Sequence, residues 1–120
     1  MNFNNVISIN KTIFKVLSEN HSLTKKLSGI YAHVPQNATF PYIHLGKVSL
    51  IDHSTKTSMH AKAFFNITIF SRDKGPKEAM SIMALTQGLI ASHLKFVESK
   101  IELTKDGVTY KLTTKYTNII

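Results

Sequence analysis

Residues 63–97, AFFNITIFSRDKGPKEAMSIMALTQGLIASHLKFV, decide the fold. In the first eight of them, Phe65, Ile67 and Ile69 alternate with their neighbours, and this period of two predicts a strand. A polar interruption follows, and from Pro76 the period lengthens to three or four residues, which predicts a helix. The expected helical stripe is Ala79, Met83, Thr86, Ile90, His93/Leu94 and Val97. A helix of roughly 20 residues is about 30 Å long, enough to cover one face of a small sheet.

A second amphipathic helix is predicted at the N-terminal end, from Asn4 or Asn5 to Ser18. Its expected buried stripe is Val6, Ile9, Ile13, Val16 and Leu17. Ser22 is expected to cap a short helical turn, and Gly29 to end that turn in the left-handed conformation. A short strand over residues 30–34 should then stop at a proline.

The remaining segments read as strands of one sheet. Ile43 and Leu45 have the opposite parity to Val48 and Leu50, so a bulge at Gly46-Lys47 would return all four to one face. Near the C-terminal end, a strand at 100–103, the turn Asp106-Gly107 and an alternating run at 108–116 predict a hairpin. We therefore expect an α+β fold, with an antiparallel sheet of about four to five strands packed on one face by two helices.

Composition restricts the class of protein. The chain has 120 residues, which suits one domain over residues 1–120. It has no cysteine, which excludes disulfides, thiolate catalysis and cysteine-ligated metals. No apolar run is long enough for a membrane span, and the N-terminus lacks the pattern of a secretory signal. The net charge is +8, but the lysines are scattered, which is typical of a solvated surface rather than a nucleic-acid groove.

The sequence offers no pattern of catalytic or metal-binding residues. Its six histidines show no HExxH or HxH spacing, and we interpret His93 as a packing residue on the helical stripe. No GxSxG elbow or glycine-rich phosphate loop occurs, and the carboxylates do not pair; Glu78 reads as an ordinary surface charge near a helix start. Asp52, His53 and Ser54 are too close in sequence for triad geometry. We therefore expect no enzyme, no catalytic or metal site and no cofactor.

A small basic nucleic-acid-binding or regulatory module is the alternative to a structural protein. Lysines and tyrosines alternate at Tyr110-Lys111 and Lys115-Tyr116, as in some nucleic-acid platforms. The alternation, however, places the tyrosines on the face opposite the lysines, where they would pack under helices. Direct DNA binding is therefore not expected.

Function is most expected in the longest polar insertion of the chain, residues 52–62. We predict that it is a loop between two strands. Its polar and titratable side chains are Asp52, His53, Ser54, Thr55, Lys56, His60 and Lys62.

Four short motifs occur in an order that resembles a known family. They are FPYIHLG at 40–46, DHSTK at 52–56, FSR at 70–72 and Glu78-Ala79. Together with the helix and capped turn before them, they resemble the small tail-completion proteins (tail terminators) of long-tailed phages and of phage-derived gene transfer agents. The resemblance spans nearly the whole chain.

The resemblance implies a structural virion-assembly role for the chain. Such proteins form a ring, commonly a hexamer, that caps the tail tube and joins it to the head connector, so the implied partners are other copies, the tail-tube protein and the connector. The chain would be cytoplasmic before assembly and in the tail of a phage or prophage-derived particle afterwards, and no membrane is involved. The loop at 52–62 would contact neighbouring subunits or the tube. Family members usually carry a further strand after the region matching 113–120, so an open sheet edge is expected here, with dimers or edge pairing as alternatives to a ring.

Overall fold

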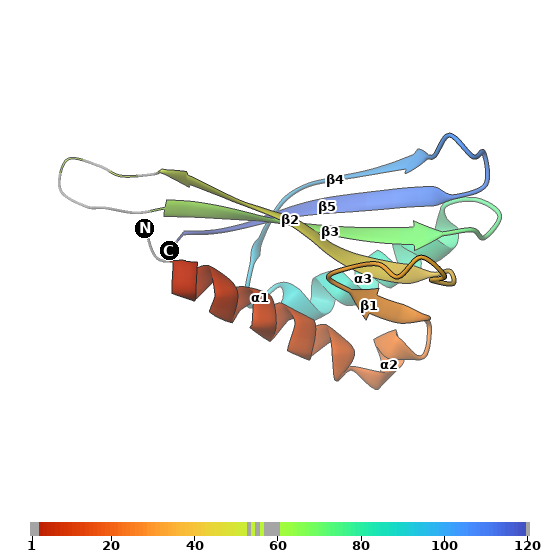
Figure 1. Ribbon diagram of the computed structural model, residues 1–120, viewed down its shortest axis with the longest axis horizontal. Helices are drawn as coiled ribbons and strands as arrows, with labels where there is room; N and C mark the ends of the chain where they lie inside the picture. Colours follow the sequence, from red (N-terminus) through yellow and green to blue (C-terminus); the bar gives the residue numbers. More distant parts are fainter. Residues whose placement is uncertain (1–2, 53, 55, 57–60, 120) are drawn as a thin grey trace.

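The computed structural model of the protein describes residues 3–52, 54, 56 and 61–119 (Figure 1). The elements are α1 (Phe3–Ser18), α2 (His21–Thr24), β1 (Gly29–Tyr31), β2 (Tyr42–Asp52), β3 (Ala61–Ser71), α3 (Lys77–Ile90), β4 (Lys95–Leu103) and β5 (Tyr110–Ile119). The strands form a five-stranded sheet in the order β1-β2-β3-β5-β4. The predicted α+β fold is confirmed. The sheet is mixed rather than antiparallel throughout, because the connection at 32–41 returns the chain so that β2 starts beside the start of β1 and runs parallel to it.

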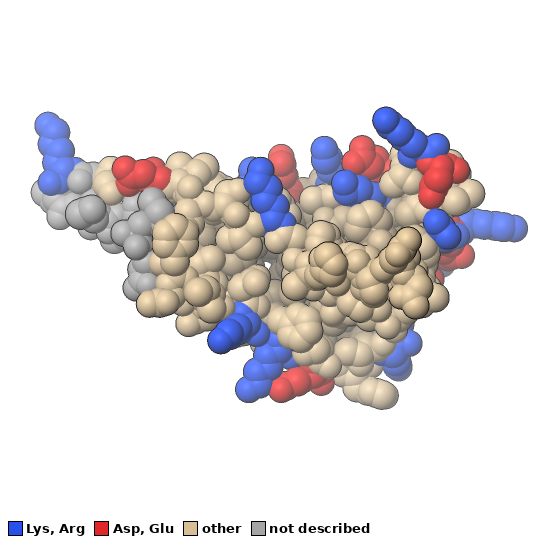
Figure 2. All heavy atoms as spheres, viewed as in Figure 1, with Lys and Arg blue, Asp and Glu red and all other residues tan. Residues whose placement is uncertain are grey.

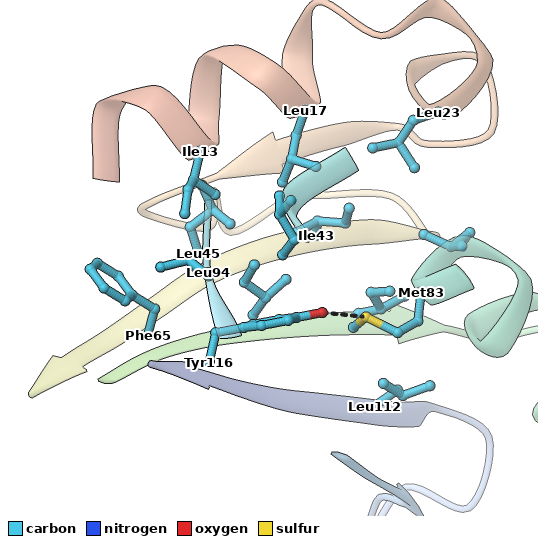
Figure 3. Close-up of a cluster of buried hydrophobic side chains, with 14 of the residues drawn as sticks. Ile13, Leu17, Leu23, Ile43, Leu45, Phe65, Met83, Leu94, Leu112 and Tyr116 are labelled. Carbon is cyan, nitrogen blue, oxygen red and sulfur yellow. Dashed lines mark hydrogen bonds between the residues drawn. The ribbon is translucent and has the colours of Figure 1, made fainter. Parts of the chain in front are cut away.

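Both long helices lie on the same face of the sheet and leave the other face open (Figure 1). The odd-numbered residues of β3 point toward the helices and are buried, as the alternation predicts. Figure 3 shows Ile13 and Leu17 of α1 and Leu23 of α2 directed toward side chains of the sheet such as Ile43 and Tyr116. The core therefore lies between the sheet and the helices.

The predicted bulge in β2 is confirmed. Leu45 lies opposite Ile67 and Val48 lies opposite Phe65. Between these two pairs β2 therefore contains one residue more than β3. This extra residue brings both predicted pairs onto the face toward the helices: Ile43, Leu45, Val48 and Leu50.

The predicted extent of the second long helix is wrong. Helix α3 ends at Ile90, and Val97 belongs to β4. His93 is exposed in the connecting turn rather than packed on a helical stripe, and its carbonyl oxygen accepts a hydrogen bond from Asn118 Nδ2 at 3.2 Å. The strand β5 gives the reason, because Lys95 and Phe96 pair with its Thr117 and Tyr116, and this pairing would be lost if the helix continued beyond residue 94.

The short helix α2 begins differently from the prediction. Its cap is Asn20, whose Oδ1 accepts a hydrogen bond from the backbone N–H of Leu23 at 3.0 Å, and Ser22 lies inside the helix. Gly29 has no left-handed conformation and begins β1, which ends at Tyr31 instead of Val34. A Cβ on Gly29 would fall 2.3 Å from the Tyr31 hydroxyl oxygen, so the glycine makes room for this ring.

The predicted hairpin at Asp106-Gly107 is confirmed, with a longer connection than two residues. Gly107 has a φ of +76°, which favours glycine, and Thr104 N–H donates to the carbonyl oxygen of Thr109 at 2.8 Å. Val108 is 55% exposed while Thr109 is buried, opposite to the predicted parity, because β5 begins only at residue 110.

Candidate assembly surfaces

The predicted contact loop is described only in part. Asp52 ends β2, and its Oδ1 accepts hydrogen bonds from Ser54 Oγ at 2.6 Å and from Ser54 N–H at 3.0 Å. Both residues are exposed, as is Lys56. Three predicted residues lie outside the described ones: His53, Thr55 and His60. The structure therefore brings two of the predicted side chains together, in a local polar turn.

Lys62, assigned to the loop by the sequence analysis, is the second residue of β3 and lies on the open face of the sheet. Its ammonium group is 5.5 Å from the centre of the Phe64 ring, and that of Lys115 is 4.7 Å from the same ring. The tyrosines of β5 do lie opposite its lysines, but Phe64 of the neighbouring strand adds an aromatic ring to the lysine face. A polar groove of about 240 Å³ continues this face, lined by Lys47, Ser49, Phe64, Asn66, Glu98, Lys100, Thr113 and Lys115.

Aromatic side chains gather at the β1 end of the same face. The Tyr42 ring stacks on Phe70 with a centroid distance of 5.0 Å, and meets Phe40 at 5.2 Å and Tyr31 at 5.8 Å. The guanidinium of Arg72 lies 4.1 Å from the Phe40 ring centre. Burial raises the pKa of Tyr42, although Arg72 opposes this effect. Figure 2 shows uncharged side chains over β1 and the connection that follows it, with most charges around the margins.

The aromatic cluster explains two of the sequence motifs. FPYIHLG contributes Phe40 and Tyr42, and FSR contributes Phe70 and Arg72. The two motifs are about 30 residues apart in sequence and in contact in space, because β2 and β3 pair with Tyr42 opposite Phe70. They stabilise the β1 end of the sheet.

A groove between α3 and β4 exposes apolar side chains. Its volume is about 460 Å³, and we call it the α3–β4 groove, lined by Met80, Met83, Ala84, Gln87, Phe96, Ser99 and Leu112. Met80 is 55% exposed and Phe96 48%. All nine residues of β4 are exposed. This groove was not predicted from the sequence, because a helix that continues through residues 96–97 leaves no strand β4 to form it.

A second apolar surface runs along α1. Phe3, Ile7 and Phe14 lie at intervals of four and seven residues and therefore share one side of the helix, which we call the α1 stripe. These side chains are between 42 and 64% exposed. The stripe is offset from the buried positions Val6 and Ile13. The spacing of Phe3, Ile7 and Phe14 is visible in the sequence, but it does not distinguish an exposed apolar side of a helix from a buried one.

Three carboxylates of the described part, those of Asp52, Glu78 and Asp106, accept hydrogen bonds in local structure. Glu78, interpreted from the sequence as an ordinary surface charge, is half-buried and its Oε1 accepts a hydrogen bond from Ser71 Oγ at 2.6 Å, which links the start of α3 to the end of β3. No group of three or more histidines and carboxylates that could hold a metal ion occurs among the described residues. Within the same residues, no helix has the length and apolar character needed to cross a membrane.

Asp106 organises the β4–β5 turn. Its carboxylate accepts hydrogen bonds from Thr109 Oγ1 at 2.6 Å, Thr104 Oγ1 at 2.7 Å and the backbone N–H groups of Thr109 and Val108 at 2.9 and 3.0 Å. Arg72 Nη2 lies 3.7 Å from Oδ2 of the same carboxylate. These hydrogen bonds, those of Thr109 and Thr104 first, hold the pKa of Asp106 well below its ordinary value.

The acid sensitivity of the fold should therefore depend on Asp106. A carboxyl whose pKa is lowered by folding stabilises the folded state above its unfolded pKa of about 3.9, and this stabilisation is lost as the pH falls. We expect Asp106→Asn to have a lower urea midpoint than wild type at about pH 7 and a difference that shrinks toward about pH 3. Glu102→Gln, which removes an exposed carboxylate from β4, controls for the loss of one charge. A difference that does not change with pH would contradict the assignment.

Comparisons with known proteins support the resemblance seen in the sequence. The family described as Tail completion protein gp17 matches residues 11–116. No curated protein sequence matches the chain. Among solved structures, a chain from the "Virion of native gene transfer agent (GTA) particle" has a TM-score of 0.76 at 17% sequence identity, with 88% of each chain covered, so the two share a fold. The chain belongs to the tail completion protein gp17 family, and its role is a structural one in phage tail assembly.

Proposed function

We propose that the chain forms a ring of six subunits, the number that the resemblance to tail-completion proteins implies. This ring caps the tail tube and joins it to the head connector. The family membership supports the place in the tail, and the nine-residue edge strand β4 is the observation that carries the proposal of a ring. An exposed edge with apolar side chains is a surface that soluble proteins normally cover. A neighbouring subunit would cover it.

The proposal includes a purely structural role in the virion tail. Asp52, Glu78 and Asp106 accept hydrogen bonds within turns or between elements, which is the behaviour of structural carboxylates. We treat residues 1–120 as one tail-completion domain, cytoplasmic until it joins the tail. The solved chain of similar fold comes from the virion of a gene transfer agent particle, which supports this location.

The loop at 52–62 is proposed as the contact with the tube. It joins β2 and β3, whose ends lie beside the start of α1 at one end of the elongated molecule (Figure 1). Asp52, Ser54 and Lys56 are polar and exposed, which suits a surface that stays soluble before assembly. The proposed contact residues remain Asp52, His53, Ser54, Thr55, Lys56, His60 and Lys62.

The test uses tail tubes assembled from the tail-tube protein of the same particle. The chain should decorate one end of each tube in electron micrographs, and Lys56→Glu should weaken this binding at least tenfold. Lys74→Glu changes the same exposed side-chain type in the β3–α3 connection and should bind as wild type. Binding along the whole tube, or no binding by the wild-type chain, would contradict a terminator. If both variants bind tube ends equally well, the terminator function is retained and Lys56 is not part of the contact with the tube.

The nucleic-acid module is the second candidate, and Phe64 between Lys62 and Lys115 favours it. Binding to DNA through phosphates should weaken steeply with salt, with a slope that reports the number of contacts. Binding to tubes should depend much less on salt. A steep slope for DNA that Lys115→Ala reduces, without any decoration of tubes, would favour this second function.

A further inference from the structure

We infer that the chain associates head to tail, with the α1 stripe of one copy seated in the α3–β4 groove of the next. This inference rests on the proposed ring and names the two surfaces that would build it. Both surfaces present exposed apolar side chains.

The two surfaces belong to opposite edges of the molecule. Helix α1 packs against β1 and α3, and β1 is one edge of the sheet. The groove lies on the other side of α3, under β4, which is the other edge. The α1 stripe and the α3–β4 groove of one copy therefore cannot contact each other, whereas the stripe of one copy can contact the groove of another.

The helix layer has an open position under β4. Helix α3 packs on β3 and β5, and α1 lies beside it toward β1. Phe96, Ile101 and Leu103 of β4 lie opposite Tyr116, Leu112 and Tyr110 of β5, so their side chains are on the face toward the helices. No described helix covers them, and they are 36 to 50% exposed. A third helix beside α3 would cover them, and α1 of the next copy presents a suitable apolar side.

The chemistry of the two surfaces is complementary. The α1 stripe offers two phenylalanines and one isoleucine, on a helix that exposes them over about 16 Å from Phe3 to Phe14. The groove offers Met80, which is 55% exposed and whose flexible thioether adapts to aromatic rings. An apolar helix face seated in an apolar groove is a recurring mode of protein recognition.

The area is sufficient for a specific contact. The exposed apolar parts of the α1 stripe, Met80, Phe96, Ile101 and Leu103 amount to on the order of 600 Å². Since about 60% of an interface is apolar, the whole contact would bury roughly 1,000 Å², the size at which specific interfaces begin. Because the contact uses two different surfaces, it repeats from copy to copy and can close into a ring, whereas a contact between identical surfaces would stop at a dimer.

Light scattering on two variants tests the inference. The stripe variant is Ile7→Glu with Phe14→Glu, and the groove variant is Met80→Glu with Ala84→Lys, a pair of charges four residues apart that suits the helix. The wild-type chain should form oligomers below about 1 mM, and each variant should weaken self-association at least tenfold. Val108→Glu is the matched control, because Val108 is as exposed as Met80 but lies outside both surfaces. Circular dichroism and urea midpoints verify that all variants are folded.

Mixing the two variants distinguishes head-to-tail contact from other arrangements. The stripe variant keeps its groove and the groove variant keeps its stripe, so an equimolar mixture can make one intact contact and should form heterodimers but no larger species. A mixture that stays monomeric, or a stripe variant that alone dimerises as strongly as the mixture does, would overturn the inference. So would a wild-type chain that stays monomeric at about 1 mM.

The outcomes separate this inference from the proposed function. If the variants keep the oligomeric mass of the wild type and still bind tube ends, the ring contacts lie elsewhere and the proposed terminator function is retained. If the wild-type chain forms rings that do not bind tubes, and the substitutions of the two variants abolish these rings, the head-to-tail contact is supported and the terminator function is rejected.

Discussion

Replacing Tyr116 by alanine is expected to lower the free energy of unfolding by about 3–5 kcal/mol, the range for large aromatic residues in a core. The Tyr116 side chain is fully buried under the helices, and its ring meets Phe96 edge-on at 6.2 Å. Figure 3 shows it reaching from β5 toward Met83 of α3. The ring therefore joins the central part of the sheet to the helix layer, and its removal leaves a cavity between them. Urea denaturation of the variant measures the loss.

Tyr116→Phe separates the ring from its hydroxyl group. The hydroxyl donates a hydrogen bond to Gln87 Oε1 and contacts Met83 Sδ at 3.7 Å, so its loss should cost only about 1 kcal/mol. Burial also raises the pKa of Tyr116 to about 12. The neutral hydroxyl therefore stabilises the fold below about pH 10, and this stabilisation is lost as the pH rises through 12. The phenylalanine variant should lose less stability than wild type over this alkaline range. Equal losses for the alanine and phenylalanine variants at neutral pH would contradict the role given to the ring.

The elements that could be predicted from the sequence are those whose residues alternate between a buried and an exposed face. In β3, Phe65, Ile67 and Ile69 face the core and Asn66 faces the open side, and only one register satisfies this pattern. The bulge in β2 followed from the same rule. Two apolar pairs of opposite parity can share a face only if the strand contains one extra, unpaired residue between them.

Long-range pairing accounts for the main error of the sequence analysis. The apolar positions of α3 continue with helical spacing through Leu94 to Val97, and nothing local ends the helix at Ile90. Its end is set by β5, which lies about 20 residues further on and pairs with Lys95–Leu103. Leu94 is still buried, so the apolar pattern was correct for burial there although the backbone is not helical.

The candidate assembly surfaces were harder to predict than the core. The side chains of the α1 stripe, and Met80 and Phe96 in the α3–β4 groove, are largely exposed within one copy, so the periodicity that marks a core does not single them out. The groove also combines residues of three elements that meet only in the folded chain. The loop at 52–62 was found by its length and polarity, and its role stays a prediction.

Deleting Asn66 is expected to prevent folding, whereas deleting Lys47 is expected to be tolerated. The loss of one residue in the middle of β3 turns one half of the strand over, so that either Phe65 or Ile67 and Ile69 face water. Each such side chain costs about 1.5–3 kcal/mol, and polar residues enter the core in exchange, so the total approaches the whole stability of a typical domain. Soluble yield and urea denaturation measure the result.

Lys47 belongs to the bulge, so its deletion has the opposite consequence. With one residue fewer, Leu45 stays opposite Ile67 and Val48 stays opposite Phe65, and the ladder between them becomes regular. Lys47 is exposed, so we expect a change of about 1 kcal/mol or less. Substituting Lys47→Ala in the full-length chain controls for the side chain alone. The Lys47 deletion could instead prove as damaging as the Asn66 deletion. The fold would then depend on the bend of β2 at the bulge, and not on which face of the sheet its side chains occupy.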